Sequence, residues 1–191
     1  MKKQRLSVPV VCCALVAFGT FRLFAAVTES STNVPLAIPD AGNVDSTLTF
    51  SVNGTISDAN LTVNITHTWD KDIRLTLTSP SVAGQVLWQN CGGSGDNLTN
   101  TVIDDQAAAL AACTFAAAPF TGSFRPSDGG GASPVAAPGT MGAFNGSASG
   151  GVWTLNVVDD SAICTGTLNA WSLTLDGTPP LPVELMSLEV L

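Results

Sequence analysis

The chain contains a single histidine, His67, and this limits the chemistry that its side chains can perform. A serine-protease triad would have to use His67 as its general base. The sequence contains neither a Gly-x-Ser-x-Gly elbow nor a Gly-Thr-Ser segment that would supply the nucleophile. His67 also stands at the end of a strand-like run. We therefore interpret His67 as structural and expect no catalytic residues in this chain.

Aspartates at strand ends and in loops indicate a second chemistry, the binding of a hard cation. Carboxylate, amide and carbonyl oxygens are the ligands that Ca²⁺ prefers, and the loop over residues 92–105 offers several. The alternative is that Asp favours turns and solubility without any metal. The residues that we predict as Ca²⁺ ligands are Asp96, Asn97, Asp104 and Asp105, with Asp70 and Asp72 as weaker candidates.

The first 26 residues are typical of a signal peptide. A basic start precedes an apolar run over residues 6–21, which is short for a membrane span. We expect a secreted or cell-surface protein with no membrane association after cleavage. Beyond residue 26 there are three basic and fifteen acidic residues, hence a formal charge of −12. A surface this acidic is expected to repel nucleic acid and anionic lipid.

Three cysteines lie beyond the leader: Cys91, Cys113 and Cys164. The absence of a Cys-x-x-Cys motif and the single histidine argue against a zinc site. Cys91 and Cys113 flank a loop-like segment, so we predict a disulfide between them. Cys164 is then left over, either as a buried thiol or as an exposed one that could cross-link chains.

Alternation of apolar and polar residues predicts strands with one buried and one solvated face. The strand-like runs cover residues 46–52, 60–67, 72–78, 85–89, 152–158 and 167–175. Residues 92–151 are loop-dominated, with room for a helical turn or two over residues 106–112. Seven or eight short strands split by one long excursion indicate an all-β sandwich, specifically a jelly roll of about eight strands.

An ordered series of short motifs resembles the P (Homo B) domain of subtilisin-like proprotein convertases. The central one is Thr-His-Thr-Trp-Asp-Lys-Asp-Ile at residues 66–73, and the similarity extends over residues 38–176. The family usually has Gly where this chain has Lys71. The other motifs cover residues 38–40, 57–58, 77–81, 92–97, 104–105, 119–126, 151–155, 159–160 and 165–173.

The resemblance implies an eight-stranded jelly roll and a supporting role. In convertases such a domain follows the protease domain, supports its stability and tunes its calcium and pH response, and bacterial relatives occur in large secreted proteins. The implied division is a signal peptide (1–26), an extended linker (27–37), the P/Homo B-like sandwich (38–177) and a Pro-rich tail (178–191). The tail resembles the linker that precedes C-terminal sorting modules, which suggests a longer product.

Three function classes follow from these observations. The leading one is a secreted, non-catalytic module that stabilises or docks onto a protein partner, such as a protease or another secreted domain. The second is a carbohydrate- or surface-binding jelly roll that uses Trp69 and Trp88 as platforms. The third is a serine endopeptidase, an activity that domain association alone would suggest. Solvent exposure of the two tryptophans distinguishes the first class from the second.

Overall fold

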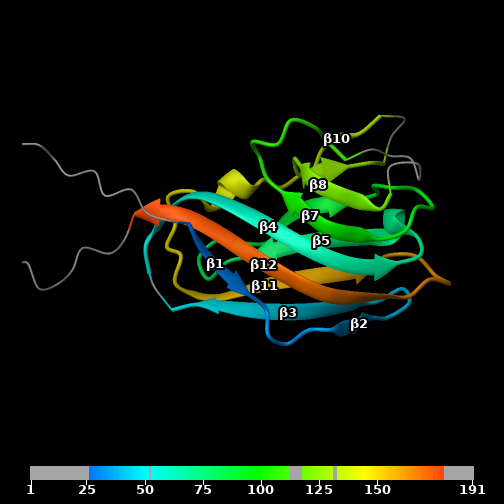
Figure 1. Cartoon of the computed structure of the whole chain (residues 1–191), viewed down its shortest axis with the longest axis horizontal. Coiled ribbons are helices and arrows are strands. Elements are labelled where there is room, and N and C mark those ends of the chain that lie inside the picture. Colours follow the sequence, from blue (N-terminus) through cyan, green and yellow to red (C-terminus); the bar gives the residue numbers. More distant parts are fainter. Residues whose placement is uncertain (1–25, 52, 112–117, 131–132, 179–191) are drawn as a thin grey trace, which may run out of the picture.

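A computed structural model describes residues 26–51, 53–111, 118–130 and 133–178, and shows two packed β-sheets (Figure 1). The first sheet has the order β1 (Val27–Ser30), β12 (Gly166–Thr178), β4 (Thr55–His67), β7 (Leu98–Ile103) and β8 (Phe120–Phe124), with β2 (Leu36–Ile38) also paired to β12. The second has the order β10 (Val135–Ala136), β9 (Ser127–Asp128), β6 (Gln85–Gln89), β5 (Ile73–Thr78), β11 (Gly151–Asp159) and β3 (Asn43–Phe50).

The core forms where the alternating apolar faces of the two sheets meet. On β4, Leu61, Val63 and Ile65 are buried, while the residues between them are more exposed. On β11, Leu155 and Val157 do the same from the other sheet. The predicted all-β sandwich is therefore confirmed. The described residues contain twelve strands rather than about eight, because several short edge strands add to the long ones. The jelly-roll connectivity stays a prediction.

The segment that the sequence analysis places in a linker belongs to the sheet. β1 pairs antiparallel with β12 through Val27 and Leu175, and β2 pairs with the start of β12 through Ile38 and Gly166. Both short strands pair with the edge of β12 opposite to the edge that pairs with β4. The sandwich consequently begins at Val27, eleven positions before the boundary that the motifs suggested.

The described parts of residues 92–151 hold more regular structure than their composition predicts. β7 pairs with β4, and β8 pairs in parallel with β7. The alternation that would identify β7 is broken, because Asn100 has a φ of 48° and the register shifts between Leu98 and Thr101. Over residues 106–111 the chain forms a turn and an isolated bridge from Leu110 to Arg125 in place of the expected helical turns.

Two short 3-10 helices mark opposite ends of the sandwich (Figure 1). η1 (Asp70–Asp72) follows β4 at the end where Gly166 pairs with His67, and we call this the η1 end. η3 (Met141–Phe144) lies beside the start of β4, where Gly146 N–H donates to the Ile56 carbonyl, and we call this the η3 end. Residues 1–25, the tail from residue 179 and Cys113 lie outside the described residues.

Candidate functional site

His67 is part of a buried pair at the η1 end. Its Nε2 lies 3.2 Å from Oδ2 of Asp159, and its Nδ1 lies 2.9 Å from the Trp69 carbonyl oxygen. Gly166 packs so closely against the imidazole that a Cβ atom at this position would lie 2.5 Å from Cδ2 of His67. With both ring nitrogens engaged and the ring out of solvent, His67 is held as a structural link between β4 and β11.

Asp70, one of the weaker sequence candidates, is the least satisfied polar residue at this end. Its exposed fraction is 0%, and neither carboxylate oxygen has a hydrogen-bond partner. Burial raises the pKa of Asp70 to about 7, the Asn97 N–H opposes this change, and the negative charge of Asp96 adds to it. The Asn97 N–H itself donates to the His67 carbonyl, at 3.2 Å. A buried carboxylate without donors is costly unless a proton or a cation neutralises it.

The glycine-rich loop after Cys91 lies against Asp70. The Asp70 N–H donates to the Gly95 carbonyl at 2.9 Å, and the Lys71 N–H donates to the Gly93 carbonyl at 3.2 Å. Gly92 has a φ of 93°, and a methyl group there would lie 2.7 Å from Cβ of Asp70 and 2.7 Å from the Phe120 ring. Only glycine allows this approach, so the loop backbone is brought directly onto the buried acid.

Asp96 and Asn97 come from the same loop but have different surroundings. Asp96 is exposed and contributes negative charge near Asp70. Asn97 has a φ of 76°, and its Oδ1 accepts the His67 N–H at 3.0 Å. Asn97 therefore joins the end of β4 to the start of β7. Asp72 is half-buried, and burial followed by the charge of Asp159 raises its pKa, which the charge of His67 opposes.

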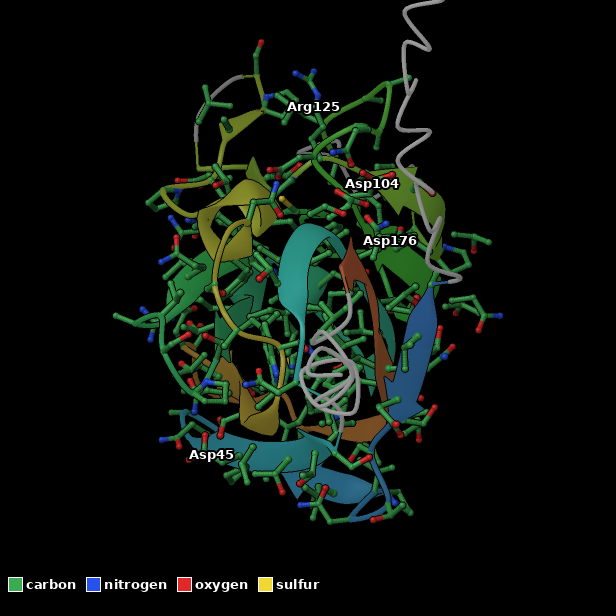
Figure 2. The ribbon with its side chains drawn as sticks, turned by 90° about the vertical axis from the view of Figure 1, so that its left-hand side faces the viewer. Asp45, Asp104, Arg125 and Asp176 are labelled. Atoms are coloured by element: carbon green, nitrogen blue, oxygen red, sulfur yellow. The ribbon has the colours of Figure 1, made fainter. Side chains whose placement is uncertain are left out.

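Asp104 and Asp105 lie at the opposite end of β7, and Figure 2, which looks onto the η3 end, shows Asp104 there with Asp176 and Arg125. Asp104 Oδ1 accepts the Gln106 N–H at 2.7 Å. Asp105 accepts the N–H groups of Met141 at 3.0 Å and Gly142 at 2.7 Å. Because a strand rises about 3.3 Å per residue, the six residues of β7 keep these acids roughly 20 Å from Asp96.

The four leading Ca²⁺ candidates are therefore divided between two places and cannot share one ion. Within the described ranges, no group of three or more His, Cys, Asp or Glu side chains is arranged to hold a metal. The predicted Cys91–Cys113 disulfide involves a residue outside those ranges and stays a prediction. Cys91 is buried, and Cys164 is half-buried in the turn before β12.

The two tryptophans proposed as sugar platforms, Trp69 and Trp88, differ in their solvent exposure. Trp88 is 0% exposed and packs edge-on against Phe120, at a ring-centroid distance of 5.0 Å. The hypothesis that Trp88 is a sugar platform is wrong, because its indole belongs to the core between the sheets. Trp69, in contrast, is 44% exposed at the turn into η1. Sequence pattern alone could not separate the two, because both stand within or beside strand-like runs.

Two exposed apolar side chains share the η1 end. Ile163, in the turn between β11 and β12, is 91% exposed and has a φ of 92°, a conformation that β-branched residues rarely adopt. Its N–H donates to Asp40 Oδ1 at 2.8 Å, which holds the turn in place. This turn adjoins η1, since the Asp160 N–H donates to the Asp72 carbonyl at 2.9 Å. Trp69 and Ile163 therefore belong to neighbouring loops.

A family model described as the proprotein convertase P-domain matches residues 126–175, which include β11 and most of β12. This match confirms the resemblance to the P domain of proprotein convertases. No curated protein matches the chain.

Two solved structures that contain the same protease align with this chain. The complex of Aeromonas sobria serine protease with the chaperone ORF2 aligns with a TM-score of 0.49 and 16% identity over 83% of this chain and 28% of that one. The structure described as serine protease of Aeromonas sobria aligns with a TM-score of 0.47 and 16% identity over 81% and 28%. The chain thus spans about 28% of the length of these matches.

Proposed function

We propose that this chain is a secreted, non-catalytic accessory module of the kind attached to subtilisin-like endopeptidases, and that it docks onto a protein partner and stabilises it. The observation that carries this proposal is the match to the P-domain family model over residues 126–175. P domains are accessory domains that support a protease and do not cleave peptides themselves. Among the residues that the structure describes, no helix has the length and apolar character to cross a bilayer.

The state of His67 supports a non-catalytic role. A general base must reach both a nucleophile and a substrate through a free ring nitrogen. Here Nε2 faces the Asp159 carboxylate, Nδ1 faces the Trp69 carbonyl, and the ring is buried. His67 and Asp159 are two of the three residue types of a catalytic triad, but here both nitrogens of His67 make structural contacts.

The η1 end supports docking as the mechanism. Trp69 and Ile163 expose apolar surface on two adjoining loops, and tryptophan is prominent among residues that contribute most to protein interfaces. The backbone at Ile163 also supports docking. Strained backbone conformations are often found at functional sites, and here the strain does not bury the Ile163 side chain within the chain. We therefore assign the docking surface to these two residues and the turns that carry them.

Site-specific photo-crosslinking in the native host tests this assignment. A photoreactive amino acid at position 69 or 163 is expected to capture the same secreted protein, whereas position 27, which is also apolar and exposed but lies on β1 at the η3 end, is not. Equal capture from position 27, or no capture from positions 69 and 163, would contradict docking through the η1 end.

An assay of proteolysis tests the non-catalytic role separately. The purified chain is expected to leave casein intact. Hydrolysis that disappears in a His67→Gln variant, with the circular dichroism spectrum of the variant unchanged, would show instead that the chain is an endopeptidase.

A further inference from the structure

We propose that the η1 end holds a Ca²⁺ site built around Asp70, with Asp96 and backbone carbonyls of the loop at residues 92–95 as further ligands. This site differs from the grouping that sequence proximity suggested, because Asp104 and Asp105 take no part in it. The proposal is independent of the docking function and would stand if no protein partner were found.

The Asp70 side chain lacks both hydrogen-bond donors and a neutralising charge. Its two oxygens lie in the protein interior and accept no hydrogen bond. Within the described residues no Lys or Arg side chain forms an ion pair, so the adjacent Lys71 does not neutralise Asp70. Protonation would remove the charge but would still leave an acceptor oxygen without a donor. A bound cation would satisfy both oxygens at once.

The groups that surround Asp70 offer further oxygen ligands. The loop over residues 92–95 is pressed onto Asp70 by two backbone hydrogen bonds and by the absence of a side chain at Gly92. Asp96 follows directly and adds a second negative charge near the first. A carbonyl oxygen that already accepts one hydrogen bond keeps a second lone pair for a metal.

The chemistry of these ligands determines which cation fits the site. A set made of carboxylate and carbonyl oxygens selects a hard ion, and Ca²⁺ accepts six to eight ligands in irregular geometry with water completing the shell. The only nearby imidazole, that of His67, is occupied on both nitrogens. Because the described part of the chain provides only two carboxylates here, we expect a dissociation constant on the order of 10⁻⁴ to 10⁻³ M, as in extracellular modules.

Thermal unfolding of the purified secreted chain, with EGTA or with added CaCl₂, is the primary test. At about ten times the dissociation constant, Ca²⁺ is expected to raise the melting temperature by roughly 3–5 °C, and Mg²⁺ by clearly less. Asp70→Asn, which keeps the shape of the side chain, is expected to abolish the rise, and Asp96→Asn to reduce it. Asp104→Asn is the matched control, because this acid lies at the η3 end, and it should keep the full response.

A binding measurement keeps the test independent of folding stability. Tb³⁺, a luminescent substitute for Ca²⁺, is expected to give tryptophan-sensitised emission with the native chain and with Asp104→Asn, and CaCl₂ should displace it. Asp70→Asn should give no such emission. The proposal is overturned if EGTA and CaCl₂ give the same melting temperature, if Mg²⁺ matches Ca²⁺, or if Asp70→Asn responds like the native chain.

Discussion

Asp70 and Asp105 each accompany a short 3-10 helix, one at either end of the sandwich. Asp105 accepts two backbone N–H groups from η3 and remains partly in solvent. Asp70 begins η1, is completely buried, and accepts no hydrogen bond. An aspartate thus satisfies backbone N–H groups at the η3 end, whereas at the η1 end an aspartate has its own oxygens unsatisfied.

A third aspartate shows what decides between these two outcomes. Burial alone would raise the pKa of Asp128, but hydrogen bonds from Asn90, Gln89 and Gly130 lower it below its ordinary value. Asp128 is therefore stable as an anion without any metal. Asp128 is also only half-buried, so donors and depth together determine whether a carboxylate in this fold can keep its charge. Asp70 is fully buried, and the Asn97 N–H near it donates to the His67 carbonyl instead, which is why a cation is assigned to the η1 end and none to the η3 end.

The largest expected effect comes from removing the imidazole that Oδ2 of the buried Asp159 contacts, which leaves only the Ser161 N–H as a donor to this carboxylate. His67→Ala removes this buried partner, and removing one member of a buried polar pair that includes a carboxylate typically costs about 3–5 kcal/mol. The free energy of unfolding, measured in urea, should fall by that amount. The double variant His67→Ala, Asp159→Asn should recover part of the loss, because the carboxylate of Asp159 is then removed as well. A loss below about 1 kcal/mol in His67→Ala would mean that the pair is not structural.

The next effect concerns the pH dependence of the chelated protein. Burial raises the pKa of Asp70 from 3.8 to about 7, so between these values the folded state holds a proton that the unfolded state has released. Stability must then fall as pH rises through this window and stay low above it. Asp70→Asn removes the penalty, so in EGTA at pH 8 it should exceed the native chain by up to about 4 kcal/mol.

The control for this comparison lies at low pH. Near pH 4.5 the native Asp70 is protonated when folded, so the advantage of Asp70→Asn should shrink to a small remainder. Parallel stability curves for the two proteins between pH 4.5 and pH 8 would show that Asp70 does not carry a buried charge. The contrast between Asp70 at the η1 end and Asp105 at the η3 end would then be wrong.

The smallest effect is expected at the η3 end. Asp105→Ala leaves the N–H groups of Met141 and Gly142 without their acceptor, and hydrogen bonds to a charged group contribute about 1.5–3 kcal/mol. We expect a loss of roughly 2 kcal/mol in urea unfolding, since the Gly142 N–H can be solvated in part. The variant should respond to Ca²⁺ as the native chain does. A lost calcium response would place the cation at the η3 end instead.

The sequence determined the class of fold because its signal is local. Period-two alternation over β4, β11 and β12 specifies which side chains face the core, whatever the partner strand. Where a backbone irregularity interrupts the period, as at Asn100 in β7, the local signal is lost and the strand becomes visible only through its pairing with β4. The structural role of His67 could likewise be anticipated from its place at a strand end.

Only the tertiary structure decided which acids lie together. Asp96 and Asp104 are close in the chain, and the sequence therefore groups them, but β7 runs between them and carries them to opposite ends. Asp70 is distant from Asp96 in the chain, yet η1 and the glycine loop meet through the Gly95 carbonyl. Burial is decided in the same way, since Trp69 and Trp88 differ only in what packs over them. Contact and solvent access belong to the assembled sandwich, and no local pattern encodes them.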